Sequence, residues 1–227
     1  MGRVSPAGSF SPTLLTIRIH FPPMKLAALG IRMHSGWGIL VAVTDTAEIL
    51  ERRRISVIRD EITGGKQPYH HAERLGIPAA ENYLRGYVLE CNRLATEEIQ
   101  RTVSALHSHG YRAAKAALLL ASGRQLPSLP QILAVHPLIH SAEGELFRET
   151  VRHGCESLSI PVSGYKEREL EADAIKLLGD LFPTVVQQFA RAGKSIGPPW
   201  TADHKSAALA AYVALKALLA KHVSATG

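Results

Sequence analysis

Two histidines and a glutamate near the middle of the chain have the spacing of metal ligands. His136, His140 and Glu143 stand at positions i, i+4 and i+7, which places all three on one stripe of a helix. Two imidazoles and a carboxylate can bind zinc or a similar ion. Because of Pro137, the sequence does not determine the residue at which this helix begins. The pattern predicts a metal site, and the alternatives are a ligand-contacting histidine and a histidine that is only hydrogen-bonded or solvated.

Arginines and cysteines give weaker chemical signals. Arg52, Arg53 and Arg54 form a run in a predicted strand. On a sheet edge such charges discourage pairing with another sheet, and they could also contact nucleic acid. Cys91 and Cys155 are the only cysteines of the chain, which excludes a disulfide scaffold and a cysteine-based zinc site. We expect both to be packed thiols.

The composition is that of a soluble globular protein. The 227 residues suggest one domain or at most one and a half, with 46% hydrophobic and 20% charged residues. These values exclude a disordered chain and a coiled coil. Lysine and arginine exceed aspartate and glutamate by 26 to 20, a formal charge of +6. That charge permits an anionic partner without requiring one.

The ends of the chain are expected to lie outside the domain. Residues 1–24 contain many glycines, serines and prolines and read as a disordered extension, which precedes a domain over residues 25–222 and a tail over 223–227. Met24 resembles a natural start. The apolar patch at 14–19 is too short for a signal-peptide core or a membrane span. We therefore expect a cytoplasmic protein with no membrane contact.

The chain reads as strands followed by alternating helices and strands. The short spacing of the first three strands predicts an antiparallel meander. Later strands, joined to it through helices, should run parallel to the first strand in a mixed sheet covered on both faces. The expected strands are 26–32, 37–44, 48–58, 115–121 and 160–165, and the expected helices are 68–75, 79–107, 131–155, 166–178, 183–192 and 201–222.

This order and four local sequences resemble the ribonuclease H-like superfamily, in its Holliday-junction-resolvase branch. The resemblance implies an α/β fold with a five-stranded mixed sheet, helices on both faces and the third strand at an edge. The matching segments are LGIRMHSGWG at 29–38 for the first hairpin, 115–121 for the fourth strand, LSIPV at 158–162 for a Gly-(Leu/Ile)-Pro-Val strand, and DHKSAALAA at 203–211 for the final helix.

Nucleases of this family hold two magnesium ions with about four carboxylates, because hard divalent cations need oxygen ligands. The first-strand carboxylate corresponds to Arg32, and the fourth-strand carboxylate would fall near Ser122. The last helix keeps Asp203, but its partner position is Ser206. One carboxylate of the four remains, so we predict that the two-metal nuclease activity and its Mg²⁺ or Mn²⁺ site are lost. No other cofactor is predicted.

Basic and imidazole groups take the place of the missing carboxylates. Arginine and histidine would suit an anion such as a phosphate, a carboxylate or a nucleic-acid backbone. The alternative is a structural ion pair between Arg32 and Asp203, because a buried charge needs a partner. The candidate ligand-binding residues are Arg32, His34, Ser122, Arg124, Asp203, Lys205 and Ser206.

Three functions remain open at this point. The first is an inactive ribonuclease H-like domain that binds nucleic acid or a protein partner. The second is an enzyme in which histidine and arginine side chains, or a metal bound by histidines, act in the cleft where the related family would hold its metal ions. This hypothesis requires His34, His136 or His140 to converge on one pocket. The third is an assembly role for the alanine-rich last helix, which could pack on the sheet or on a second copy. The resemblance itself implies a homodimer.

Overall fold

A computed structural model describes residues 24–121 and 125–226, so the predicted N-terminal extension lies almost entirely outside the described residues. Its centre is one mixed β-sheet with the strand order β3-β2-β1-β4-β5. The sheet consists of β1 (Lys25–Met33), β2 (Trp37–Thr44), β3 (Ile49–Ser56), β4 (Tyr111–Leu120) and β5 (Val162–Lys166).

The pairing of the strands confirms the predicted sheet. β1 pairs with β2 and β2 with β3 in antiparallel register, which gives the meander. β4 runs parallel to β1, and β5 runs parallel to β4, because a helical segment precedes each of them. β3 forms one edge of the sheet, as the ribonuclease H-like resemblance implied. The predicted α/β class, with five strands and helices on both faces, is therefore confirmed.

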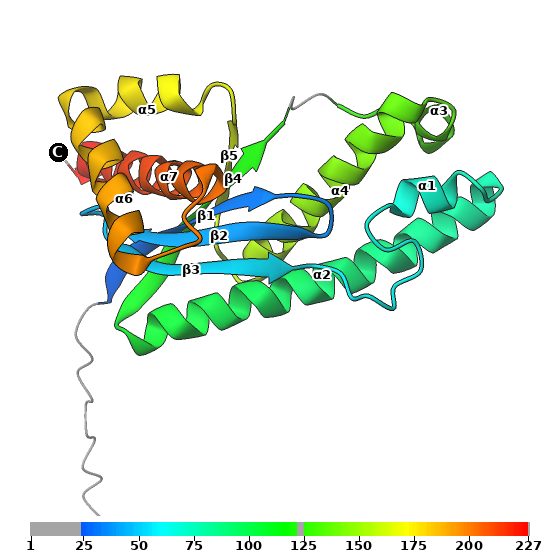
Figure 1. The fold of residues 1–227 in the computed structure, drawn as a ribbon, viewed down its shortest axis with the longest axis horizontal. Helices are drawn as coiled ribbons and strands as arrows, with labels where there is room; N and C mark the ends of the chain where they lie inside the picture. The colour runs from blue at the N-terminus through cyan, green and yellow to red at the C-terminus, as the bar shows by residue number, and fades with distance from the viewer. Residues whose placement is uncertain (1–23, 122–124, 227) are drawn as a thin grey trace, which may run out of the picture.

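The helices form two layers, one on each face of the sheet (Figure 1). α2 and α4 pack on one face, and α5, α6 and α7 cover the other. α1 and α3 lie beside the far ends of α2 and α4, away from the sheet. The bounds are α1 (Pro68–Ala72), α2 (Ile77–Ser108), α3 (Leu129–Leu133), α4 (His136–Ser157), α5 (Leu170–Leu178), the 3₁₀ turn η1 (Gly179–Leu181), α6 (Phe182–Ile196) and α7 (Ala202–Thr226).

The length of α2 explains why part of the protein projects beyond the sheet. Its 32 residues span about 48 Å at 1.5 Å per residue. The nine residues of β1 span only about 30 Å. The part of α2 that extends beyond the sheet lies beside α1 and α3. These helices pack through small apolar clusters that are separate from the main core.

The alanine-rich helix α7 packs on the sheet. Ala207, Ala208 and Ala211 are completely buried against β1 and β2. Gly30 of β1 allows this close approach, because a Cβ atom there would lie 1.8 Å from the carbonyl oxygen of Ala207. The first alternative for the alanines, packing on the sheet, is thus the observed one, and these three side chains are not free to contact a second copy.

Several predicted elements have other bounds in the structure. β4 begins at Tyr111 rather than at 115, and α5 begins at Leu170 rather than at 166. The single helix expected over 131–155 is divided into α3 and α4, and Pro137 stands in the first turn of α4, where its missing N–H costs no hydrogen bond. Val135 lies at the junction between the two helices and is 44% exposed. At the C-terminus α7 continues to Thr226, so the expected tail at 223–227 is helical over 223–226.

Within residues 24–121 and 125–226, we find no helix with the length and apolar character that crossing a bilayer would require.

The contact at Gly30 gives a test of the packing of α7. A Gly30→Ala substitution should lower the free energy of unfolding by about 1–3 kcal/mol or more, because α7 must move to admit the methyl group. The matched control is Gly86→Ala in the interior of α2, where no atom lies within 4 Å of the added Cβ. That change should stabilise the protein by about 0.5–1 kcal/mol. Urea denaturation of both variants measures the two effects, and equal stability of the variants would contradict this packing.

Candidate functional site

Arg32 makes two ion pairs at the carboxyl end of β1. Its Nη1 lies 2.8 Å from Oδ1 of Asp203, and its Nε lies 2.8 Å from Oε1 of Glu167. The side chains of Arg32 and Asp203 are each 24% exposed, whereas that of Glu167 is 44% exposed. The structural alternative for Arg32 and Asp203 is therefore the observed arrangement. We call Arg32, His34, Glu167 and Asp203 the strand-end cluster.

The sheet topology brings these residues together from three elements. Arg32 stands near the end of β1, and Asp203 stands in the first turn of α7, where a carboxylate favours the positive end of the helix dipole. Glu167 directly follows β5, and its backbone N–H donates to the carbonyl of Leu120 at the end of β4. The sequence reasoning missed Glu167. The signal that could have found it was its position two residues after the end of the predicted strand 160–165.

His34 completes the network around Asp203. Its Nε2 lies 2.8 Å from Oδ2 of Asp203 and 2.9 Å from Nη1 of Arg32. Nε2 can donate to the carboxylate or accept from the guanidinium, but it cannot do both. The imidazole also stacks on the ring of Trp37, with 4.2 Å between the ring centroids. Both carboxylate oxygens of Asp203 are consequently occupied by neighbouring side chains.

The strand-end cluster does not fit the two divalent cations that the resemblance implied. Two such ions require about four carboxylates, and the cluster contains only Asp203 and Glu167, each bound to Arg32. A cation placed between them would displace, or be repelled by, the guanidinium group of Arg32. We therefore derive no catalytic step through a metal at this position.

A pocket of about 370 Å³ adjoins the cluster and contains three arginines and one carboxylate. Arg52 donates to the carbonyl oxygens of Ile196, Gly197 and Pro199 and so holds the segment before α7. The guanidinium of Arg54 lies 4.4 Å from the centroid of the Trp37 ring. We call this the arginine pocket; its lining residues are Trp37, Ile39, Arg52, Arg53, Arg54, Pro199, Thr201, Asp203 and His204.

His204 reports the electrostatic environment of the arginine pocket. Burial and the positive charge of Arg52 lower the pKa of His204 below its usual 6.5, against the opposing effect of Asp203. Its Nδ1 accepts a hydrogen bond from the backbone N–H of Thr201 at 3.2 Å, which closes the N-terminus of α7. An accepting Nδ1 carries no proton, so this bond also favours the neutral imidazole.

The other predicted ligand-binding residues lie elsewhere. Lys205 and Ser206 line a separate pocket of about 190 Å³ with Val186 and Phe189 of α6. Ser122 and Arg124 lie outside the described residues. Of the seven candidates, the structure thus brings together Arg32, His34 and Asp203.

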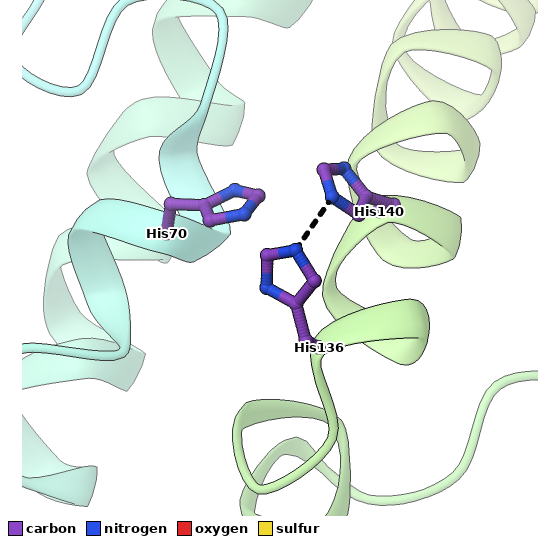
Figure 2. Close-up of side chains that lie close together, drawn as sticks. All are labelled: His70, His136 and His140. Atoms are coloured by element: carbon purple, nitrogen blue, oxygen red, sulfur yellow. Dashed lines mark hydrogen bonds between the residues drawn. The ribbon is translucent and has the colours of Figure 1, made fainter.

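The predicted metal ligands lie in a second cluster, together with a histidine from another helix. His136 and His140 face His70 of α1 (Figure 2), and one ligand nitrogen from each histidine lies within 4.8 Å of the others. Glu143 instead accepts a hydrogen bond from Nδ1 of His70 at 2.8 Å. His34 contacts the strand-end cluster, so the convergence of His34 with His136 and His140 on one pocket is not observed.

The two cysteines are buried, as expected of packed thiols. Cys91 is completely buried and Cys155 is 1% exposed. Burial raises the pKa of each thiol to about 12, so neither has the thiolate character of a nucleophile.

The lowered pKa of His204 predicts a loss of stability in acid. The unfolded state binds a proton near pH 6.5, whereas the folded state resists it. The contribution of His204 is therefore complete above that pH and is lost as the pH falls toward the pKa of the folded state. We expect a His204→Gln variant to lose less stability than the wild type between about pH 7.5 and about pH 5.5, measured by urea denaturation. A His107→Gln control should keep the wild-type decrease, and an unchanged profile in His204→Gln would contradict the assignment.

Comparisons with known proteins find similarity to solved structures only. A scan of family models finds no match, and no curated protein matches by sequence. Among solved structures, RuvC of Thermus thermophilus in complex with a Holliday junction substrate aligns with a TM-score of 0.48 and 11% identity, covering 86% of this chain and 96% of that chain. A second structure of Thermus thermophilus RuvC aligns with a TM-score of 0.46, the same identity and the same coverage.

Proposed function

We propose that this chain is a nucleic-acid-binding domain on a ribonuclease H-like sheet that has lost two-metal nuclease activity. The observation that carries the proposal is the arginine at the carboxyl end of β1, Arg32, at a position where the resemblance would place a metal-binding carboxylate. There the guanidinium of Arg32 occupies the space between Asp203 and Glu167, with 2.8 Å to each. Arg52 and Arg54 extend the positive charge into the adjoining pocket.

The position of this positive charge supports an anionic ligand. Open α/β sheets bind ligands beyond the carboxyl ends of their strands, and the strand-end cluster and the arginine pocket lie at that end. The pocket volume of about 370 Å³ is in the range of small-ligand sites, which begins at roughly 300 Å³. The lowered pKa of His204, caused partly by Arg52, agrees with a positive potential inside it. A phosphate group would satisfy that potential.

Arg54 is the group best placed to contact a phosphate. It is exposed at the rim of the arginine pocket, and no carboxylate partner of it occurs among the described residues. Its contact with Trp37 fixes the guanidinium without neutralising it. Glu167 is the more exposed partner of Arg32, so a phosphate oxygen can replace it at lower cost than Asp203. The overall charge of +6 and the isoelectric point of about 9.5 favour a polyanion as the source of that phosphate.

Binding can be measured by fluorescence anisotropy with labelled single-stranded, duplex and branched DNA and with RNA, between about 50 and about 200 mM salt. We expect affinity that decreases as salt increases. Arg54→Ala should weaken binding and reduce the slope of log K against log salt by about 1, the value for one lost phosphate contact.

The matched control is Arg93→Ala on α2, which removes the same charge from a distant exposed arginine that is paired with Glu90 and Glu97. It should leave the affinity and the salt slope close to those of the wild type. No binding at low salt, or equal losses in the two variants, would contradict a nucleic-acid site at the arginine pocket and would favour a protein partner instead.

The loss of nuclease activity is tested separately. Wild-type protein incubated with branched or single-stranded DNA and either Mg²⁺ or Mn²⁺ should give no more cleavage than an Asp203→Asn variant, because Arg32 occupies both carboxylates of the cluster. Gel electrophoresis of end-labelled DNA measures the products. Metal-dependent cleavage that the substitution abolishes would show that the activity is retained.

A further inference from the structure

The cluster of His70, His136 and His140 has the geometry of a metal site outside the strand-end cluster. His70 comes from α1, whereas His136 and His140 stand one turn apart at the start of α4. The Nε2 atoms of His136 and His140 lie 3.0 Å apart, and the three rings point toward one another (Figure 2). Their centroids are separated by 4.6–5.1 Å. Three imidazoles from two helices thus converge on one point.

A buried carboxylate holds the histidine that comes from α1. The side chain of Glu143 is only 6% exposed, and its Oε1 lies 2.8 Å from Nδ1 of His70 and 3.3 Å from the backbone nitrogen of the same residue. A carboxylate only accepts, so Nδ1 of His70 carries the proton and Nε2 is left with a free lone pair. Carboxylates that orient metal-binding histidines have this arrangement.

We propose that His70, His136 and His140 bind one Zn²⁺ ion and that Glu143 orients His70 from behind. Three imidazole ligands with no thiolate suit zinc. With Zn–N bonds of 2.0–2.1 Å in tetrahedral geometry, the ligand nitrogens lie about 3.3 Å apart. The 3.0 Å between His136 and His140 is close to this value, and the 4.8 Å limit for the whole cluster requires only small side-chain rotations.

The exposure of the three ligands defines the fourth coordination position. His136 and His140 are exposed, and the side chain of His70 is 18% exposed. A zinc ion held by them faces solvent on one side, where a water molecule completes the tetrahedron, as in zinc sites that keep an open position. The ligand set differs from the stripe that the sequence indicated, because α1 supplies the third imidazole and Glu143 acts behind it.

The proposal is tested with untagged full-length protein that is stripped with a chelator, loaded with Zn²⁺ alone and passed through a desalting column. Elemental analysis should find about one zinc per chain in the wild type. Loading with Co²⁺ should give the visible absorption of a four- or five-coordinate ion. His136→Ala and His140→Ala, both at exposed positions, should abolish retention of either metal.

Two further variants distinguish zinc binding at the proposed site from nonspecific zinc binding by exposed histidines. Glu143→Gln should weaken zinc binding by about 10–100-fold, the usual effect of removing a carboxylate behind a metal-bound histidine. His153→Ala, an exposed histidine farther along α4, should bind as the wild type does. Circular dichroism verifies that each variant is folded. The proposal is overturned if the wild type retains no zinc, or if His136→Ala and His140→Ala retain as much as His153→Ala. Neither result depends on whether the arginine pocket binds nucleic acid.

Discussion

The close approach of α7 to β1 determines where the charged groups of the strand-end cluster lie. Gly30 leaves room for the backbone of Ala207, so the first turn of α7 passes directly over the end of β1. Asp203 stands in that turn, and this brings its carboxylate to 2.8 Å from Arg32. A larger side chain at position 30 would separate the helix from the strand and would move Asp203 away. The ion pairs are thus a consequence of backbone packing that the alanines of α7 make possible.

The same geometry explains how two carboxylates can lie together at the ends of the strands. A carboxylate near the carboxyl ends of several strands needs a cation close by, since an uncompensated charge in a half-buried site is costly. The guanidinium of Arg32 supplies that cation permanently and binds two carboxylates through separate nitrogen atoms. The arrangement therefore neutralises both carboxylates without a metal ion, and it leaves Arg54 and the arginine pocket as the part of this surface that is open to a ligand.

Local pattern and chain order predicted the sheet but only part of the candidate sites. The short spacing of the first three strands predicted the meander, which is observed, and the predicted strand at 115–121 corresponds to β4, which begins earlier, at Tyr111. The spacing of His136 and His140 predicted a shared helix face. It could not predict His70, which is more than sixty residues away in sequence and reaches the cluster only because α1 folds back on α2 and α4. Glu167 was missed for a different reason, since it was assigned to the predicted helix over 166–178, whereas it directly follows β5.

The histidine cluster lies in the part of the protein that projects beyond the sheet, where a bound metal ion could stabilise the packing of the helices. The parts of α1, α3 and α4 that lie beyond the main core pack on two small apolar clusters, one of Ala72, Ala80 and Leu84 and one of Ile132, Ile139 and Ala142. So few buried side chains contribute little stability, because small cores bury too little apolar area to offset the entropy of ordering the chain. A metal ion that joins α1 to α4 would add a cross-link where the apolar clusters are small. The proposed zinc site would therefore join two helices whose apolar contacts beyond the main core are few.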